Sequence, residues 1–138
     1  WSRRDRVERK RLALVSLASV ALSRGILTEA IRFFYHRPRP FVVLQSVTRL
    51  IDVGQGEYFG SFPSGHATFF FALATAMYLH DKKWGWWFFA GAMLMGVARV
   101  FAGVHWPSDV LGGALIGVAA GWFADAMVMR WRRGWQDK

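Results

Sequence analysis

The sequence predicts an all-α integral membrane bundle of about four transmembrane helices, with all of residues 1–138 in one domain. Hydrophobic residues make up 54% and aromatic residues 17% of the chain, which is high for a soluble protein of this size. Several apolar segments approach or reach the length of about 20 residues that a spanning helix needs. The basic residues also follow the ends of these segments, as they do in membrane proteins.

The first expected helix covers residues 12–35, behind a basic amino-terminal run. Its second half contains Arg24, Glu29 and Arg32, and charges at such depth usually face a protein interior or a polar site. We expect Glu29 to be a buried partner of Arg24 or of Arg32, which is three residues away on the same helix face; the alternative is a proton relay. The prolines within residues 36–40 then end the helix, because proline disfavours the helical conformation of the residue before it.

Residues 41–62 are expected to form an outer loop with a short interfacial helix. Apolar side chains recur there at helical spacing, at Val43, Leu44, Val47, Leu50 and Ile51. Polar residues occupy the other positions, which is typical of a helix that lies at a membrane surface.

Three further apolar segments predict the remaining helices. They cover roughly residues 64–80, 84–104 and 110–129, and charged residues at 81–83 and 130–133 end the first and the last. The last segment contains one charge, Asp125, which we expect to point to the membrane interface or to Arg130.

Gly113, Gly117 and Gly121 recur every four residues along one face of the last segment. Small residues at this spacing let helix backbones approach closely in lipid. We therefore interpret them as a packing surface rather than a ligand site.

The charge distribution predicts the orientation of the bundle. If four spans alternate, the amino terminus, the turn at residues 81–83 and the carboxyl terminus share one side, which then holds 12 of the 18 basic residues. By the positive-inside rule that side is cytoplasmic, so the net charge of +9 does not indicate a nucleic-acid partner. The other basic residues lie within spans or on the outer side and need a separate reason: Arg24, Arg32, Arg37, Arg39, Arg49 and Arg99.

The turn Pro63-Ser64-Gly65-His66 opens the second apolar segment. Ser64 stands where a helix N-cap belongs, and the unsatisfied N–H groups of a helix start form a natural anion site together with the helix dipole. Gly65 permits a close approach of the chain to a bound group. Our hypothesis is a phosphate site with His66 beside it as an acid–base group; the alternative is a capped transmembrane helix with an interfacial histidine.

The expected topology brings three distant segments to the outer side: Arg32 with residues 37–40, residues 63–66, and Arg99 with His105 and Asp109. The planar fork of arginine suits phosphate because it donates two parallel hydrogen bonds. An aspartate four residues after a histidine is a usual way to fix the tautomer of the ring. The opposite ring nitrogen is then available as a nucleophile or a base.

These segments resemble the type 2 phosphatidic acid phosphatase superfamily, membrane lipid phosphatases that share their site with vanadium haloperoxidases. The family pattern is Lys, six residues, Arg-Pro; Pro-Ser-Gly-His; and Ser-Arg, five residues, His, three residues, Asp. The chain matches it except that Arg32 replaces the lysine and Ala98 the serine. The bacterial undecaprenyl-diphosphate phosphatase branch is the most similar. The resemblance implies a core of six helices, of which this chain holds the last four, so we expect further spans before Trp1.

The resemblance also implies the roles of the site residues. His105 attacks phosphorus and forms a phosphohistidine, Asp109 orients His105, and His66 protonates the departing oxygen. The groups that hold the phosphate oxygens are Arg32, Arg39, Arg99 and the Ser64-Gly65 turn. Arg37 either contacts a second phosphate or is a solvated arginine beside the site. No metal and no cofactor is implied.

The expected function is metal-independent hydrolysis of a lipid phosphate or diphosphate, with undecaprenyl diphosphate as the preferred substrate and recycling of the peptidoglycan lipid carrier as its role. Alternatives of the same mechanism are phosphatidylglycerophosphate, phosphatidic acid and lipid A phosphatases. Two other classes are a vanadate-holding haloperoxidase and a head-group binder without turnover. The expected location is the bacterial inner membrane, with the site facing the periplasmic or extracellular side and with lipid as the partner. The sequence makes no prediction of oligomeric state.

Overall fold

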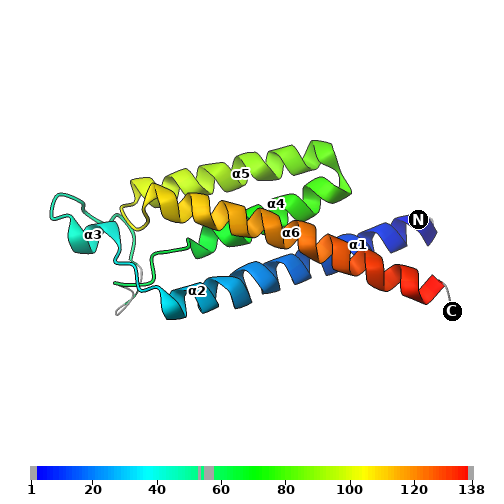
Figure 1. The fold of residues 1–138 in the computed structure, drawn as a ribbon. Helices are drawn as coiled ribbons and strands as arrows, with labels where there is room; N and C mark the ends of the chain where they lie inside the picture. The colour runs from blue at the N-terminus through cyan, green and yellow to red at the C-terminus, as the bar shows by residue number, and fades with distance from the viewer. Residues whose placement is uncertain (1–2, 53, 55–57, 137–138) are drawn as a thin grey trace.

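The computed structural model describes residues 3–52, 54 and 58–136, and every regular element within these residues is helical. One long helical rod consists of α1 (Arg3–Val20), the π-helix η1 (Ala21–Leu27) and α2 (Thr28–Phe34). Beside it lie α4 (Gly65–His80), α5 (Lys82–Phe101) and α6 (Pro107–Gln136), and the short helix α3 (Pro40–Val43) caps one end of the bundle (Figure 1). The predicted all-α bundle is confirmed.

Helix α4 is the centre of the bundle, because it packs against α1, α5 and α6. Its contact surfaces consist largely of small side chains, and Ala67, Ala72 and Ala74 are fully buried. Opposite them are the glycines of α6: a Cβ at Gly117 would lie 2.6 Å from the carbonyl oxygen of Thr68. The interpretation of the glycine face as a packing surface is therefore confirmed.

The outer surface of the bundle is apolar. Many large hydrophobic side chains are more than half exposed, among them Leu17, Ile26, Phe33, Phe34, Leu94, Phe101, Leu111 and Leu115. Contiguous exposed apolar surface of this kind is typical of contact with a membrane or with another protein. Two helical stretches, Asp5–Phe34 and Pro107–Trp131, are long and apolar enough to cross a membrane by length and composition. For α4 and α5 a spanning role remains a prediction.

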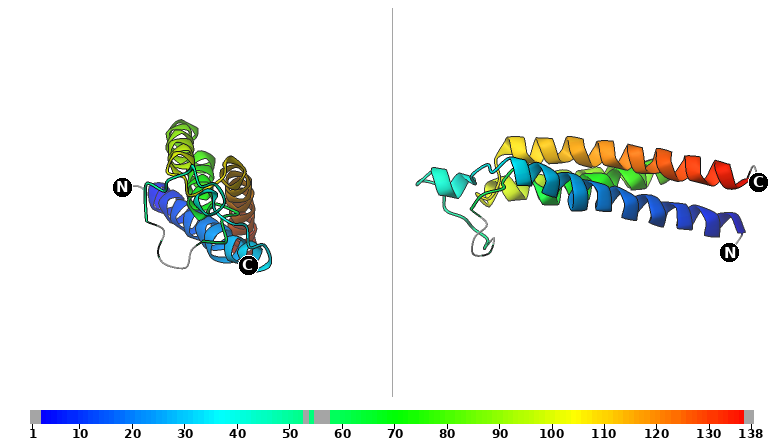
Figure 2. Two further views of the ribbon diagram at one scale, coloured as in Figure 1. Left: turned by 90° about the vertical axis from the view of Figure 1, so that its left-hand side faces the viewer. Right: turned by 60° about the horizontal axis from the view of Figure 1, so that its bottom comes forward.

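Both ends of the described chain and the α4–α5 turn lie at the same end of the bundle, opposite α3 (Figures 1 and 2). This agrees with the predicted sidedness. Asp81 stabilises the turn, since its side chain accepts hydrogen bonds from the N–H groups of Lys83 and Trp84. The expectation for Asp125 was wrong: its carboxylate pairs with Arg11 at 2.6 Å and joins α6 to α1.

The outer segment has a shorter helix than its apolar spacing predicts. The helix α3 ends at Val43, and the described residues from 44 to 52 form turns and bends. They contact the α5–α6 connection instead: the N–H of Leu50 donates to the Ala102 carbonyl at 3.1 Å, although the Leu50 side chain is exposed, and a Cβ at Gly103 would touch Val47. Residues 53 and 55–57 of this segment lie outside the described residues.

We predict that Gly117→Ala destabilises the bundle by about 1–3 kcal/mol, because the added methyl group forces α4 and α6 apart. The new Cβ would meet backbone atoms of Thr68 and Ala72 at 2.6 and 2.8 Å, and neither can move alone. The measurement is SDS-induced unfolding in mild detergent.

Gly91→Ala is the matched control, since no described atom outside its own helix turn lies within 4 Å of that Cβ position on the exposed face of α5. It should leave stability unchanged or raise it by up to about 1 kcal/mol through helix propensity. Equal effects of the two substitutions would contradict close packing at Gly117.

Candidate active site

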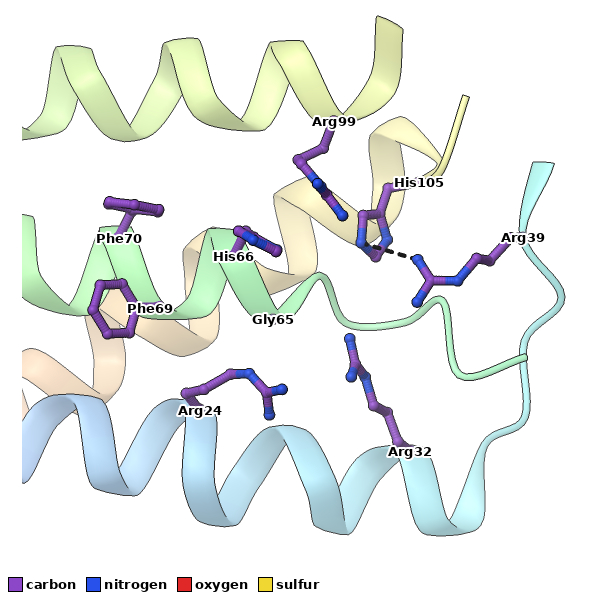
Figure 3. A pocket seen from close by; sticks show the side chains of 9 residues that line it. All are labelled: Arg24, Arg32, Arg39, Gly65, His66, Phe69, Phe70, Arg99 and His105. Carbon is purple, nitrogen blue, oxygen red and sulfur yellow. Dashed lines mark hydrogen bonds between the residues drawn. The ribbon is translucent and has the colours of Figure 1, made fainter. Parts of the chain in front are cut away.

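A cavity of about 460 Å³ lies at the end of the bundle that carries α3. Figure 3 shows that side chains from η1, α2, α4, α5 and the α5–α6 connection converge on it. Among the described residues, its lining contains four arginines and two histidines and no carboxylate. The lining residues are Arg24, Arg32, Arg39, Gly65, His66, Phe69, Phe70, Arg99 and His105.

The start of α4 forms one wall of the cavity. Ser64 is the N-cap, and its buried hydroxyl accepts from the N–H of Ala67 at 3.4 Å. The N–H of Ser64 donates to the carbonyl oxygen of Asp109 at 3.0 Å, which attaches the start of α4 to the first turn of α6. Ser64 is therefore buried next to the cavity and stabilises the start of α4, whereas Gly65 and His66 line the cavity.

Asp109 is fully buried and joins three segments of the chain. Its Oδ1 accepts from Arg37 Nη1 at 2.7 Å. Its Oδ2 accepts from the hydroxyl of Ser61 and from the N–H of Trp106, the latter at 2.8 Å. A buried carboxylate needs such charge-assisted partners, because desolvation of an isolated charge is very costly.

His105 lies between Asp109 and Arg39 and is 2% exposed. Its Nδ1 faces Asp109 Oδ2 at 3.5 Å, which is longer than the usual hydrogen bond. Its Nε2 is 3.3 Å from Arg39 Nη1. Because a guanidinium only donates, Nε2 accepts, and the proton of the neutral ring belongs on Nδ1. The lone pair is thus on the nitrogen that faces Arg39.

Burial lowers the pKa of His105 below its ordinary value of 6.5. Asp109 opposes this shift because a carboxylate favours the charged ring, while the cations Arg39 and Arg99 add to it. The imidazole is therefore neutral near pH 7. A neutral ring with its lone pair exposed to a cationic cavity is suited to nucleophilic attack on phosphorus.

Backbone carbonyl groups orient two of the arginines. Arg39 is 3% exposed and donates from Nη1 to the Val104 carbonyl at 3.0 Å. Arg32 donates from Nη2 to the Pro63 carbonyl at 3.0 Å. Arg99 extends from the last turn of α5 toward the same space (Figure 3). The cavity thus presents guanidinium groups from separate elements to one small volume, an arrangement that suits a phosphate group.

Six of the nine sequence-predicted site residues line the cavity: Arg32, Arg39, Gly65, His66, Arg99 and His105. Ser64 and Asp109 are buried behind these lining residues. Arg37 also lies behind the lining residues with its side chain 26% exposed, and its contact with a second phosphate stays a prediction. It binds Asp109, donates to the Ser108 hydroxyl at 2.8 Å, and stacks over the Trp106 ring with 5.4 Å to the ring centre.

Sequence reasoning missed Arg24 and Ser61 as parts of the site. Ser61 gave no signal, because an isolated serine in a loop is common. Arg24 is paired with Glu29, as expected, although Glu29 is 54% exposed rather than buried, and the Arg24 guanidinium also lines the cavity. In a regular α-helix Arg24 and Arg32 would be about 80° apart around the axis. The wider turn of the π-helix η1 reduces this offset, and both point toward the cavity in Figure 3.

The family model of the PAP2 superfamily matches residues 13–133. The chain therefore belongs to the PAP2 superfamily. It is 33% identical over 118 residues to the bacitracin transport permease protein BcrC of Bacillus licheniformis, covering 86% of this chain and 57% of the relative. It is 34% identical over 96 residues to the undecaprenyl-diphosphatase BcrC of Bacillus subtilis, covering 70% of this chain and 48% of the relative.

Among solved structures, the chain is similar to the crystal structure of Aquifex aeolicus LpxE, with a TM-score of 0.76 and 32% identity. This match covers 84% of the chain and 68% of the LpxE chain. The chain spans about half the length of the two curated relatives. The comparisons thus establish the family and the fold of the part of the protein described above.

We predict that the His105 ring titrates below pH 6.5, because burial and two cations disfavour its charged form. Asp109→Asn should lower the pKa further, since it removes the charge that favours the imidazolium. Arg39→Gln should raise it, since it removes a neighbouring cation. The measurement is NMR titration of histidine-labelled protein in detergent. A His105 pKa above 6.5, or shifts of the same sign in both variants, would contradict this description.

Proposed function

We propose that this protein is a lipid phosphatase that hydrolyses a phosphate head group through a phosphohistidine at His105. One observation carries the proposal: the unprotonated Nε2 of His105 lies beside a cavity that four guanidinium groups line. Such a cavity favours an anion with several oxygens, and the nitrogen beside it is a nucleophile. The names of relatives, undecaprenyl-diphosphatase among them, support the same reaction class.

In the first step, Nε2 of His105 attacks phosphorus and the bond from phosphorus to the lipid oxygen breaks. His66, which is exposed to the cavity, donates a proton to the departing oxygen. The Nδ1–H of the charged ring faces the Asp109 carboxylate, which stabilises the imidazolium. Arg32, Arg39 and Arg99 neutralise the charge that accumulates on the phosphoryl oxygens in the transition state.

In the second step, water attacks the phosphohistidine and gives its proton to His66. The products are inorganic phosphate and neutral His105, so the cycle returns to its start. Each step uses side chains that this chain supplies. Among the described residues, no group of three or more histidine, aspartate or glutamate side chains gathers as a metal site would require.

Undecaprenyl diphosphate is the substrate we propose, with undecaprenyl phosphate and phosphate as products. The name of the Bacillus subtilis relative supports this choice. The apolar surface of the bundle and the phenyl rings of Phe69 and Phe70 in the cavity suit a lipid tail. The same apolar surface disfavours a soluble haloperoxidase. The histidine pair disfavours a pure binder, because head-group binding needs only the arginines.

We further propose that the cavity faces the periplasmic or extracellular side of the bacterial inner membrane. The argument is the charge distribution: the opposite end of the bundle carries most of the basic residues, which the positive-inside rule assigns to the cytoplasm.

The test of the proposed function is release of inorganic phosphate from undecaprenyl diphosphate in detergent with EDTA present. We expect release by the unmodified chain and a fall of at least about 1,000-fold in His105→Ala, since loss of a nucleophile abolishes the covalent route. His80→Ala is the control, because His80 is an exposed histidine at the far end of α4 and should retain full activity.

Release from phosphatidylglycerophosphate, phosphatidic acid or lipid A, but none from undecaprenyl diphosphate, would contradict the substrate and retain the mechanism. A His105→Ala protein with full activity would contradict the mechanism. Tight binding of lipid without release from any of these substrates would indicate a head-group binder.

A further inference from the structure

We propose that Arg24 makes the site selective for diphosphates by binding the phosphate that stays on the lipid. The inference rests on the proposed phosphatase function and extends it, because Arg24 lies outside the three sequence motifs. Its basis is the position of Arg24 relative to the two histidines, the room that Gly65 leaves for it, and its pairing with Glu29.

The cavity has an order along the bundle axis (Figure 3). Arg39 and His105 lie nearest the outer end, His66 and Arg24 come next, and the rings of Phe69 and Phe70 lie farther along α4. Along this axis Arg24 thus lies at the level of His66, between His105 with Arg39 on one side and the rings of Phe69 and Phe70 on the other. A lipid phosphate enters such a cavity with its transferred phosphoryl group at His105 and its tail toward the rings.

The start of α4 is built to accommodate Arg24. A Cβ at Gly65 would lie 2.7 Å from Arg24 Nε, so a side chain at this position would displace the guanidinium. The π-helix that carries Arg24 is fixed to α4 at the same level. The Ser23 hydroxyl faces the Thr68 carbonyl at 3.5 Å, and the hydroxyl groups of Thr28 and Thr68 are 3.1 Å apart, all of them buried.

Glu29 fixes the direction of the guanidinium from the other side. Its Oε1 accepts a hydrogen bond from Arg24 Nη1 and lies 3.8 Å from Arg32 Nη1. One carboxylate is thus shared between two guanidinium groups, and the cavity keeps a net positive charge. Arg24 remains 42% exposed at its side chain, so a ligand can reach it.

The position of Arg24 matters for the reaction because it lies on the side from which the leaving group departs. In an in-line displacement the leaving group departs opposite the nucleophile, on the side of His66. When a monophosphate reacts, the leaving group is a lipid alcohol, which His66 protonates. When a diphosphate reacts, the anhydride P–O bond breaks, its electron pair stays on the bridging oxygen that His66 protonates, and the lipid phosphate leaves with negative charge on its other oxygens. A guanidinium at this position can bind those oxygens, which an alcohol leaving group lacks.

The test compares Arg24→Gln with the unmodified chain on farnesyl diphosphate and farnesyl phosphate, which share one tail. We expect kcat/KM for the diphosphate to fall by about 30-fold and that for the monophosphate to change by less than about 3-fold, as for loss of one charge-assisted contact. Arg24→Lys should recover part of the diphosphate activity, because it restores the charge without the fork.

Arg49→Gln is the matched control. Arg49 is also paired with a carboxylate, that of Asp52, and its side chain is 41% exposed, but it lies outside the cavity lining. Its activity on both substrates should equal that of the unmodified chain. An equal fall on both substrates in Arg24→Gln, or no fall on either, would overturn the proposed selectivity while phosphatase activity itself stands.

A binding measurement without turnover separates this inference from the proposed function. Methylenediphosphonate cannot be cleaved at its P–C–P bridge, and we expect Arg24→Gln to weaken its binding by about 10-fold or more while binding of inorganic phosphate changes by less than about 3-fold. The measurement is isothermal titration calorimetry in detergent. Equal effects on both ligands would overturn the role of Arg24 even if the chain hydrolyses lipid phosphates.

Discussion

The buried carboxylate of Asp109 is the constraint on which the site depends. It accepts hydrogen bonds from Arg37, Ser61 and the Trp106 backbone, and its own carbonyl oxygen holds the N-cap of α4. A carboxylate with no solvent contact is tolerated only when each partner is in place, because an unpaired buried charge costs several kcal/mol. The outer segment, the α5–α6 connection and the start of α4 are thereby fixed relative to His105. His105, the proposed nucleophile, thus lies beside the same group that joins these segments.

The rest of the bundle explains why a site this cationic is stable. Close packing of α4 on the glycines of α6 brings the helix starts together, and only small side chains allow that approach. The cavity then contains four guanidinium groups. Glu29 pairs with two of them, those of Arg24 and Arg32. Their mutual repulsion is relieved when an anion enters. The same charges therefore favour the binding of an anion, as the proposed function requires.

The sequence predicted the features that depend on local rules. Proline ends the first rod, Ser64 caps α4, and the glycine spacing marks a packing face, because each follows from backbone geometry alone. Asp125 was assigned to the membrane interface or to Arg130, whereas its partner Arg11 lies 114 residues away. The sequence also did not indicate that Arg37 binds Asp109, 72 residues away. Arg24 was missed because the π-helix turns it toward the same side as Arg32, and no simple sequence pattern predicts a π-helix. The segment after α3 had helical spacing, but contacts with the α5–α6 connection decided its conformation.

The most direct test of the account is to trap the covalent intermediate. The unmodified chain would be mixed with ³²P-labelled undecaprenyl diphosphate, quenched within milliseconds and digested for peptide mapping. We expect acid-labile, alkali-stable label on the peptide that contains His105, and none in His105→Ala. Label on His66 would assign the nucleophile to the other histidine. Turnover without any labelled peptide would mean that water attacks the lipid phosphate directly, and His105 would then have no covalent role.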